Sequence, residues 1–459
     1  MTAVQNEQQV GLVDPSTGET FQYVEMVDAA GADSAIARAH AAFEVWRQLS
    51  PGDRARLLRG FADEVDADIE NLAALEVRNS GHTISNARWE AGHVRDVLHY
   101  FASAPERLFG RQIPVPGGVD LTLREPLGVV GVIVPWNFPM PIASWAFAPA
   151  MAAGNTVVLK PAESTPLTAM RLAELALRAG IPEGVFTVLP GRGTVVGTRF
   201  VDNPLVRKVV FTGSTAVGKQ VLAGCSAQVK PVTLELGGKS ANIVFADADL
   251  EKAAALAPYA VFDNAGQDCC ARSRILVQRS VLDRFVELLE PAVLGMRVED
   301  PALDSSEMGP LITAAHHARV SSFLEHGDPV LIRGQAPSGP GFWFPPMVLG
   351  PVDPKADVAV EEIFGPVAVV IPFQDEADAV AIANDSSYGL SGSIWTRDIG
   401  RALRMSRAVQ AGALSVNSNS SVRYWTPFGG FKESGLGREL GPDALHAFTE
   451  EKNVFLAHD

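Results

Sequence analysis

Cysteine is scarce in this chain of 459 residues, which contains only Cys225, Cys269 and Cys270. Three cysteines in so long a chain do not make a disulfide framework, and a bridge between the neighbours Cys269 and Cys270 would be strained. The first ten residues contain no apolar run of the kind that a signal peptide needs. We therefore expect a protein of the reducing cytoplasm.

Positive charge is also in the minority. The chain has 38 Lys and Arg against 53 Asp and Glu, which gives a net charge of −15. This balance disfavours a nucleic acid or an anionic membrane surface as a partner, because both attract basic proteins. It does not exclude phosphorylated cofactors, which individual loops bind. Hydrophobic residues make up 47% of the chain, as in ordinary globular proteins, and the length predicts two to four domains.

Charged residues are missing altogether between Glu125 and Lys160, a stretch long enough to cross a bilayer. The stretch nevertheless contains five prolines, which would leave backbone groups unpaired in lipid. We therefore expect a buried core segment and no membrane span.

Metal-binding patterns are missing as well. The sequence has no Cys-x-x-Cys pair, and its nine histidines are scattered. His316 and His317 are adjacent but lack a His-Glu-x-x-His frame, and His93 and His99 fit ordinary helix positions. We expect no metal. A Cys–His hydrolase stays open as an alternative, although no histidine has a glycine-rich setting like that of Cys269.

The periodicity of apolar residues indicates the fold class. Helices are predicted in the first hundred residues, where apolar residues such as Ile36, Phe43 and Trp46 recur at helical spacing. From residue 128 onward strands and helices alternate, which is typical of a mostly parallel sheet with helices on both faces. The predicted strands are 128–134, 156–159, 185–189, 208–211, 232–236, 274–278, 367–373 and 413–417. The sequence thus predicts an α/β protein with two lobes.

One cysteine has a setting suited to chemistry. Cys269 lies in a polar, glycine-containing loop, NAGQDCCARSR, just before a predicted strand. Arg272 and Arg274 are near enough in sequence to favour the thiolate, the form that attacks electrophiles. Cys225 and Cys270, by contrast, are predicted to be small buried side chains.

Segments that follow strands offer sites for a phosphorylated cofactor. In KVVFTGSTAVG, Gly213 permits a tight turn, and the Ser214 N–H and hydroxyl can meet a phosphate at a helix N-terminus. Lys160 and Glu163 follow another predicted strand, at the end where doubly wound sheets hold nucleotides. In that position Lys160 can bind phosphate or ribose oxygens, and Glu163 can accept hydrogen bonds from ribose hydroxyls. The run GRGTVVG (191–197) has a different glycine spacing and is interpreted as a turn that starts a helix.

Two further segments are unusual for loops. PWNFP (135–139) places bulky aromatics and one amide between prolines, directly after a buried strand. ELGGK (235–239) places a carboxylate at the end of an apolar strand, and carboxylates are rarely buried without a partner or a purpose. Both segments are therefore candidates for a functional site.

Taken together, seven segments resemble the aldehyde dehydrogenase superfamily, whose members oxidise aldehydes to acids with NAD or NADP. The segments occur in the family's order and cover most of the chain. They are PWNFP (135–139), KPAE (160–163), FTGS (211–214), ELGGK (235–239), GQDCC (266–270), EIFGPV (362–367) and PFGGFKESG (427–435). One departure is Asp268, where some members carry another cysteine.

The resemblance implies catalytic roles for three residues. Cys269 is the expected nucleophile, which forms a thiohemiacetal with the aldehyde and, after hydride transfer to the nicotinamide, a thioester. Asn137 is expected to donate its amide to the developing oxyanion, together with the Cys269 N–H. Glu235 is expected to activate the water that hydrolyses the thioester. Members that hand the acyl group to coenzyme A differ at this position, so Glu235 favours hydrolysis.

The resemblance also implies a cofactor site. Glu362 resembles the residue that holds the nicotinamide ribose, with Phe364 beside the nicotinamide, and Lys160, Glu163 and Ser214 would hold the adenosine ribose and the pyrophosphate. The other expected cofactor-binding residues are Trp136, Gly213, Val217 and Leu236. A carboxylate at Glu163 repels a 2′-phosphate, so NAD is expected in preference to NADP, and Lys160 nearby softens this preference.

The expected substrate is a small-molecule aldehyde that enters between aromatic walls. By resemblance, these walls are Phe138, Trp145, Trp425 and Phe428, with Tyr424 at the edge. Such walls suit an aliphatic or aromatic aldehyde. They would also hold an ammonium group by cation–π contact, but members that oxidise amino-aldehydes usually carry Trp where this chain has Phe428.

The resemblance further implies a Rossmann-like cofactor domain, a catalytic domain, both doubly wound, and a small β extension. We expect residues 1–113 and 127–238 in the dinucleotide-binding domain and 239–440 in the catalytic domain. Residues 114–126 and 441–459 are the expected oligomerisation strands, because an edge strand needs a partner; they would form a homodimer or homotetramer.

Two alternatives stay open at this point. One is an acyl-transferring or reductive enzyme that uses the same thioester. The other is a non-catalytic descendant of the fold, against which the intact set of Asn137, Glu235 and Cys269 argues.

Overall fold

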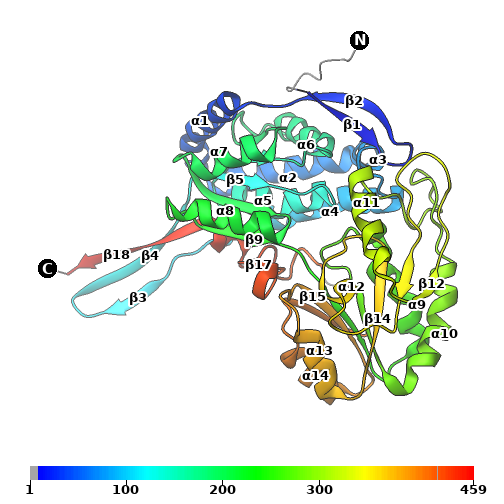
Figure 1. Cartoon of the computed structure of the whole chain (residues 1–459). Helices are drawn as coiled ribbons and strands as arrows, with labels where there is room; N and C mark the ends of the chain where they lie inside the picture. Colours follow the sequence, from blue (N-terminus) through cyan, green and yellow to red (C-terminus); the bar gives the residue numbers. More distant parts are fainter. Residues whose placement is uncertain (1–8, 421, 459) are drawn as a thin grey trace, which may run out of the picture.

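The structure is a computed structural model that describes residues 9–420 and 422–458. It shows two α/β lobes side by side and a long β extension that projects from the first lobe (Figure 1). Each lobe is built on its own mostly parallel sheet, so the predicted α/β class is confirmed.

The first lobe begins with a β-hairpin rather than a helix. Strand β1 (Gln9–Asp14) pairs antiparallel with β2 (Glu19–Glu25), and the prediction that the first hundred residues are helical is wrong for this pair. The buried side chains of this hairpin are Leu12 on β1 and Val24 on β2, and its other side chains are exposed or half-buried. Four helices follow: α1 (Ala29–Trp46), α2 (Pro51–Ala67), α3 (Ile69–Ser80) and α4 (Ile84–Ala102).

A six-stranded sheet forms the centre of this lobe, in the order β17-β9-β8-β5-β6-β7. Its parallel strands are β5 (Val129–Ile133), β6 (Thr156–Lys160), β7 (Phe186–Val188), β8 (Val206–Thr212) and β9 (Val232–Glu235). The connecting helices are α5 (Pro139–Ala152), α6 (Leu167–Arg178), α7 (Thr198–Asp202) and α8 (Thr215–Ser226). The short antiparallel strand β17 (Gly435–Leu436) reaches this sheet from far along the chain and pairs with β9.

The stretch without charge folds into β5, α5 and β6. Every residue of α5 is buried, because the helix lies between the sheet and the helices of the first lobe. Among the residues that the structure describes, no helix combines the length and the apolar character that crossing a membrane requires.

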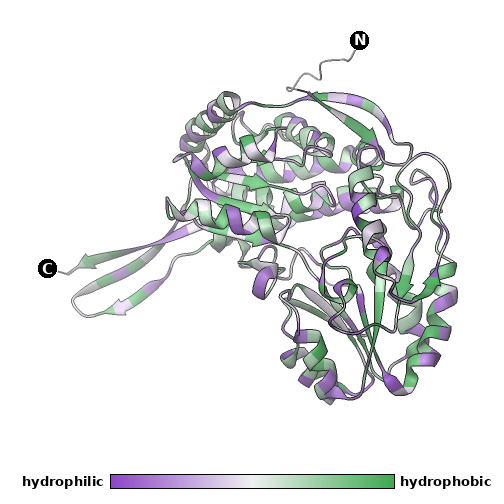
Figure 2. Cartoon of the chain, in the orientation of Figure 1, coloured by the Kyte–Doolittle hydropathy of each residue, from purple (hydrophilic) through white to green (hydrophobic). Residues whose placement is uncertain are grey.

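The second lobe contains a seven-stranded sheet in the order β12-β13-β14-β11-β10-β15-β16, parallel except for β12. Its strands are β10 (Ala241–Val244), β11 (Arg274–Gln278), β12 (Val330–Arg333), β13 (Met347–Leu349), β14 (Val367–Phe373), β15 (Ser391–Trp395) and β16 (Ala413–Val416). Its helices are α9 (Leu250–Phe262), α10 (Leu282–Leu294), α11 (Ala314–Ser322), α12 (Asp357–Val360), α13 (Glu376–Asn384) and α14 (Ile399–Ala408). Figure 2 shows hydrophobic residues concentrated in the sheets of both lobes.

The projecting extension is a separate three-stranded sheet. Strand β4 (Gly118–Pro126) lies between β3 (Gln112–Val115) and the C-terminal strand β18 (Thr449–Ala457), with which it pairs along its whole length. Apolar side chains stay exposed on it: Ile113, Leu123, Phe455 and Leu456.

Candidate active site

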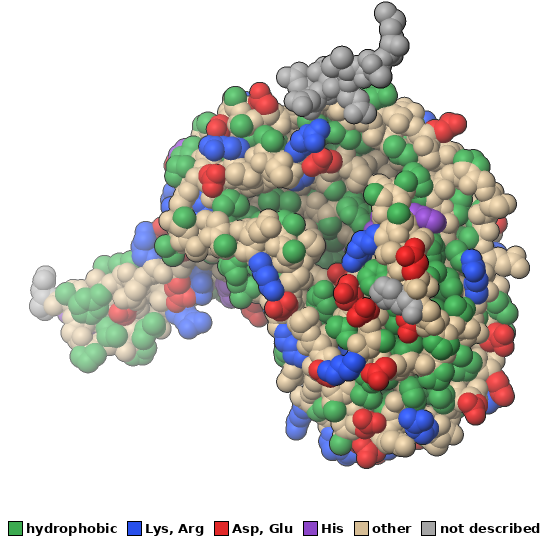
Figure 3. Space-filling model, in the orientation of Figure 1, with side chains coloured by type: hydrophobic (Ala, Val, Ile, Leu, Met, Phe, Trp, Pro, Cys, Tyr) green, Lys and Arg blue, Asp and Glu red, His purple; other side chains and the backbone are tan. Residues whose placement is uncertain are grey.

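A pocket of about 330 Å³ lies where the carboxyl ends of β5, β8 and β9 face the second lobe. The surface is hollowed between the two lobes (Figure 3). The predicted site residues that line this pocket are Trp136, Asn137, Gly213, Ser214, Glu235, Leu236, Cys269, Glu362 and Phe364. They come from five separate parts of the chain, and the parallel topology brings them together.

A second pocket, of about 260 Å³, lies on the other side of Cys269 and has aromatic walls. Its aromatic side chains are Trp89, Phe138, Trp145, Tyr259 and Phe428. Cys269 lines both pockets, so its thiol stands at their junction. A ligand in either pocket can therefore meet the same sulfur atom.

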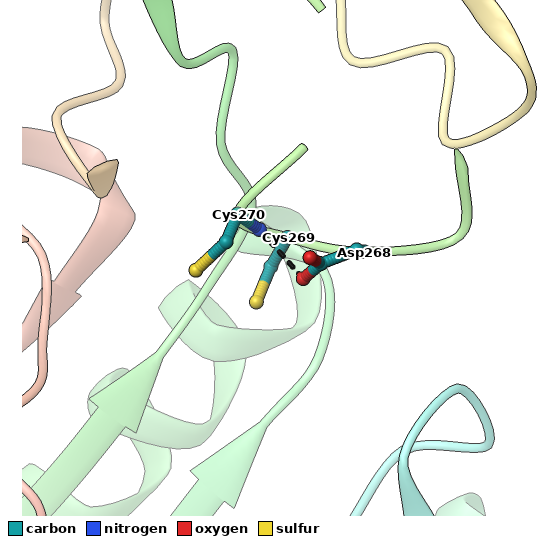
Figure 4. Close-up of side chains that lie close together, drawn as sticks. All are labelled: Asp268, Cys269 and Cys270. Atoms are coloured by element: carbon teal, nitrogen blue, oxygen red, sulfur yellow. Dashed lines mark hydrogen bonds between the residues drawn. The ribbon is translucent and has the colours of Figure 1, made fainter. Parts of the chain in front are cut away.

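The loop that carries Cys269 has an unusual backbone. Asn264 and Ala265 adopt positive φ angles of 49° and 54°, which the surrounding structure must support because such conformations are rare in residues with a Cβ. In Figure 4 the thiols of Cys269 and Cys270 lie on neighbouring side chains, and the Cys270 N–H donates to Asp268 Oδ1 at 2.8 Å. Both cysteines carry free thiols.

The prediction that arginines activate Cys269 is wrong. The Arg272 guanidinium donates to the Cys270 carbonyl at 2.7 Å, and the Arg274 guanidinium donates to Lys239, Ile382 and Ala383 carbonyls. A hydrogen bond with Cys270, burial and the charge of Asp268 raise the pKa of the Cys269 thiol. The thiol is therefore protonated at neutral pH and needs a base. Cys225 and Cys270 are buried, as predicted.

Buried amides fix the position of Asn137. Its Nδ2 donates to the Gln267 carbonyl at 2.9 Å, and its own carbonyl accepts from Asn264 Nδ2 at 2.8 Å. Gln267 in turn donates to the Asn264 carbonyl and accepts from the Ile312 N–H. An NH₂ group has two hydrogens, so Asn137 keeps a second donor for a ligand oxygen. This network ties the PWNFP loop to the Cys269 loop, and Asn264 and Gln267 were not among the predicted site residues.

Glu235 is almost completely buried at the end of β9, and neither of its carboxylate oxygens has a hydrogen-bond partner among the described residues. Burial is the main cause that raises its pKa well above the usual range, and the charge of Glu439 adds to it. A carboxyl group with a raised pKa is suited to take and return protons near neutral pH.

The glycines after Glu235 permit a close approach of three chain segments. A Cβ built on Gly238 would overlap the main-chain oxygen of Cys269, and one on Gly237 would overlap the Glu362 carboxylate. The Gly238 N–H donates to Glu362 Oε1 at 2.8 Å, and burial raises the pKa of Glu362. Gly237 and Gly238 therefore let Glu362 and Cys269 reach the same pocket.

Ser214 caps α8, and its Oγ accepts from the Val217 N–H at 3.4 Å. The free N–H groups of a helix N-terminus attract phosphate oxygens. Lys160 and Glu163 lie farther along the sheet edge and outside the lining of the larger pocket, as does Val217. Lys160 Nζ donates to the Gly191 carbonyl at 3.0 Å, and Glu163 Oε1 accepts from the Gly193 N–H at 3.0 Å. The glycine turn 191–197 thus packs against both residues.

Phe364 has a positive φ of 60°, and its ring meets Trp136 edge-on at 5.4 Å between centroids. His316 completes this cluster: it contacts the Trp136 ring at 5.3 Å and the Phe364 carbonyl at 2.7 Å. Arg319, one turn later on α11, binds the Ile363 carbonyl at 3.0 Å. Neither His316 nor Arg319, both on α11, was among the predicted site residues.

The aromatic pocket differs in part from the expected tunnel. Trp145 lines the pocket, and its indole N–H donates to His93 Nε2 at 2.9 Å. The indole therefore both packs against His93 and faces the cavity. Trp425 does not line it; its side chain is half exposed and meets Tyr424 edge-on. Trp89 and Tyr259, which the sequence analysis missed, line the pocket instead.

Comparison with known proteins decides the family. The aldehyde dehydrogenase family model matches residues 2–454. The chain belongs to the aldehyde dehydrogenase family. An aldehyde dehydrogenase of Emericella nidulans is 40% identical to it over 450 residues, which cover 96% of this chain and 90% of that protein. The phenylacetaldehyde dehydrogenase of Pseudomonas fluorescens is 40% identical over 475 residues, which cover 99% of this chain and 94% of that protein.

Solved aldehyde dehydrogenase structures share the whole architecture. The betaine aldehyde dehydrogenase of Staphylococcus aureus in complex with NAD⁺ superposes with a TM-score of 0.96 at 34% identity, over 99% of this chain and 92% of that one. The NAD-dependent aldehyde dehydrogenase of Sinorhizobium meliloti superposes with a TM-score of 0.96 at 39% identity, over 98% of this chain and 91% of that one. The predicted resemblance to this family is confirmed.

Proposed function

We propose that this aldehyde dehydrogenase oxidises an aldehyde to the carboxylic acid with NAD, through a thioester on Cys269 that water hydrolyses. The observation that carries the proposal is the position of Cys269 between two pockets, one of which it shares with Asn137 and Glu235. A nucleophile, an amide donor and a carboxylate around one cavity are the groups that acyl chemistry needs.

In the first step Cys269 Sγ attacks the aldehyde carbon. The thiol proton is released to solvent, the carbonyl π electrons move to oxygen, and the Asn137 amide and the Cys269 N–H stabilise the oxyanion. Bound NAD supplies the hydride acceptor. As the C–H bond breaks, the oxygen returns its electrons to carbon, and Cys269 is left acylated.

In the second step Glu235 takes a proton from water, which attacks the thioester carbon. The C–S bond breaks, the Cys269 thiolate leaves and regains a proton, and the acid departs. A base is needed because water is a weak nucleophile, and Glu235 has no competing hydrogen-bond partner among the described residues.

NAD fits the residues that line the larger pocket. Glu362, Phe364 and Trp136 would hold the nicotinamide end, and Ser214 at the start of α8 would meet the pyrophosphate. Lys160 and Glu163 would hold the adenosine ribose, and Glu163 disfavours the 2′-phosphate of NADP. The related enzymes of S. aureus and S. meliloti, one in complex with NAD⁺ and one NAD-dependent, support this choice.

We infer that the substrate is an aldehyde with an aliphatic or aromatic body, held in the aromatic pocket. Phe138, Trp145 and Phe428 would contact that body, with Trp89 and Tyr259 as further walls. The likeness to the phenylacetaldehyde dehydrogenase of P. fluorescens supports an aromatic aldehyde as the first substrate to test.

We further propose that the β extension joins subunits into a homodimer or homotetramer, since β18 and β3 are edges and apolar side chains stay exposed on them. The division into a cofactor domain (1–113 and 127–238), a catalytic domain (239–440) and extension strands stays part of this proposal. So does a cytoplasmic location, which three free cysteines support.

The test is a panel of aldehydes with NAD or NADP, with and without coenzyme A, followed by NADH or NADPH absorbance and product analysis. We expect the free acid as product, faster turnover with NAD, and no dependence on coenzyme A. Acyl-coenzyme A as the sole product would contradict hydrolysis by Glu235. The absence of turnover with every aldehyde would contradict the proposed function.

A further inference from the structure

A buried ionisable cluster lies behind the PWNFP loop, outside both pockets. It consists of Glu76 on α3, His82 in the turn between α3 and α4, and Glu90 on α4, each with at most 3% of its surface exposed. Their side-chain ligand atoms lie within 4.8 Å of one another. Buried carboxyl groups are costly, so a cluster of this kind needs a physical account.

His82 connects this cluster to the residues in front of it. One ring nitrogen, Nδ1, makes a short hydrogen bond with Glu90 Oε1. The ring packs edge-on against Phe138, with 5.5 Å between centroids. Burial lowers the pKa of His82, while the charges of Glu76 and Asp263 and a hydrogen bond to the backbone of Asn137 act in the opposite direction. A hydrogen bond that raises the pKa stabilises the protonated ring, so the ring donates and the Asn137 carbonyl accepts.

Hydrogen bonds hold Glu76, the α3 member of this cluster, in place. Thr168 Oγ1 on α6 donates to Glu76 Oε2 at 2.8 Å, and Ser80 Oγ donates to the Glu76 carbonyl at 2.7 Å. Gly81 ends α3 in the left-handed conformation at φ 78°, which turns the chain so that His82 points inward. His82 therefore follows directly on the end of α3 and is anchored to α4 by its bond to Glu90.

A metal ion does not fit this cluster. The direct hydrogen bond between His82 and Glu90 leaves no room for a cation, which needs about 2 Å to each ligand atom. His82 instead bonds to the Glu90 carboxyl group through Nδ1 and makes a second hydrogen bond to the main chain of Asn137. This is the arrangement by which a carboxylate orients an imidazole, which then holds a third group.

We propose that His82 is a positioning residue for Asn137: anchored by Glu90, it holds the Asn137 main chain and the Phe138 ring so that the Asn137 amide stays aimed at the aldehyde oxygen. The inference rests on the proposed function, in which that amide stabilises the oxyanion. Because a displacement of about 1 Å at a reacting centre can cost a hundredfold in rate, a support behind the loop affects the chemistry without touching the substrate.

The test compares His82→Phe, which keeps a ring against Phe138 but loses both hydrogen bonds, with His82→Gln, whose amide restores a donor. Trp46→Phe is the matched control, since it removes a buried hydrogen bond to the Met151 carbonyl in the core of the first lobe. We expect His82→Phe to lower kcat by about ten- to a hundredfold with the KM for NAD changed less than about twofold. His82→Gln should recover part of the loss, and Trp46→Phe should keep the wild-type kcat per folded enzyme.

Two further readouts separate positioning from general damage. Iodoacetamide alkylates Cys269 without forming an oxyanion, so its rate should stay within about twofold of wild type in His82→Phe while aldehyde oxidation falls. Hydrogen–deuterium exchange of the segment 134–141 should rise in His82→Phe and stay unchanged in Trp46→Phe. The inference is overturned if kcat stays within twofold, if alkylation falls in parallel with kcat, or if exchange of 134–141 does not change. Wild-type enzyme that oxidises no aldehyde would contradict the proposed function instead, and the exchange measurement would still decide whether His82 holds the loop.

Discussion

Glu235 and Glu439 are buried together, and none of their four carboxylate oxygens has a hydrogen-bond partner among the described residues. Burial raises the pKa of Glu439 to about 8, against the opposing charge of Lys208, and the charge of Glu439 adds to burial in raising the pKa of Glu235. Two adjacent carboxyl groups resist simultaneous ionisation. Glu235 can therefore act as a base only at pH values at which the pair of carboxyl groups has lost a proton.

This coupling predicts the pH dependence of turnover. Because Glu235 must be ionised to activate water, kcat for wild type should rise from pH 6 to pH 9. Glu439→Gln removes the like charge, so Glu235 should ionise at lower pH. The rise of kcat with pH should therefore shift to lower pH. Turnover measured across this range with a saturating aldehyde checks the shift. An unchanged or alkaline-shifted limb in Glu439→Gln would show that the two carboxyl groups do not interact.

The same group predicts how stability depends on pH. The pKa of Glu439 is about 8 in the folded protein, above the 4.5 of an exposed glutamate. Between these values the unfolded chain has released a proton that the folded chain keeps, so the free energy of unfolding falls as pH rises, by at most about 1.4 kcal/mol per pH unit for one group. Glu439→Gln should flatten this fall.

Thermal unfolding followed from pH 5 to pH 8 measures the effect. Glu376→Gln is a suitable control, because its half-buried carboxylate pairs with Arg404 and its pKa is lowered. That control should leave the slope between pH 5 and pH 8 as in wild type. If the free energy of unfolding changed with pH equally in wild type and Glu439→Gln over this range, the result would contradict a proton held on Glu439.

Asn137→Ala should lower kcat/KM for an aldehyde by about 10²- to 10³-fold, because one oxyanion donor is lost. The amide network would also lose its bond to the Gln267 carbonyl, so the melting temperature must be measured beside the rate. Asn264→Asp, which removes a donor to the Asn137 carbonyl without touching the pocket, should cost less. A loss of less than about threefold for Asn137→Ala would contradict a role in binding the oxyanion.

Gly237→Ala should raise the KM for NAD. The added Cβ would overlap the flexible end of Glu362, which must swing away from the pocket. Gly60→Ala on α2, whose Cβ would meet its nearest neighbour at 3.7 Å, serves as the control and should leave both KM and kcat unchanged. Steady-state kinetics with varied NAD checks this. A Gly237→Ala enzyme with the wild-type KM would show that Glu362 does not hold the cofactor.

The fold was predictable where local patterns dominate. Strands β11 and β14 begin and end at the predicted residues, because each is built around a run of apolar, largely β-branched residues. The hairpin β1–β2 was missed because its strands are mostly exposed and only Leu12 and Val24 mark the buried face. Strand β17 could not be foreseen, since two residues acquire strand character only by pairing with β9.

The site was predictable as a set of motifs, but its contacts were not. Arg272 and Arg274 are close to Cys269 in sequence, yet their guanidinium groups bind main-chain carbonyls, which no local pattern indicates. Trp89 and Tyr259 lie on helices of different lobes and meet only in the folded protein. Tertiary packing, rather than spacing along the chain, decides these contacts.

The central claim is an acyl group on Cys269 that Glu235 helps water to remove. Glu235→Gln enzyme mixed rapidly with NAD and an aldehyde that wild type oxidises, then quenched in acid, tests it by mass spectrometry of the intact protein and its peptides. We predict one acyl adduct per chain, located on Cys269, together with one equivalent of NADH and little further turnover. An unmodified Cys269, or steady release of acid at the wild-type rate, would contradict the account.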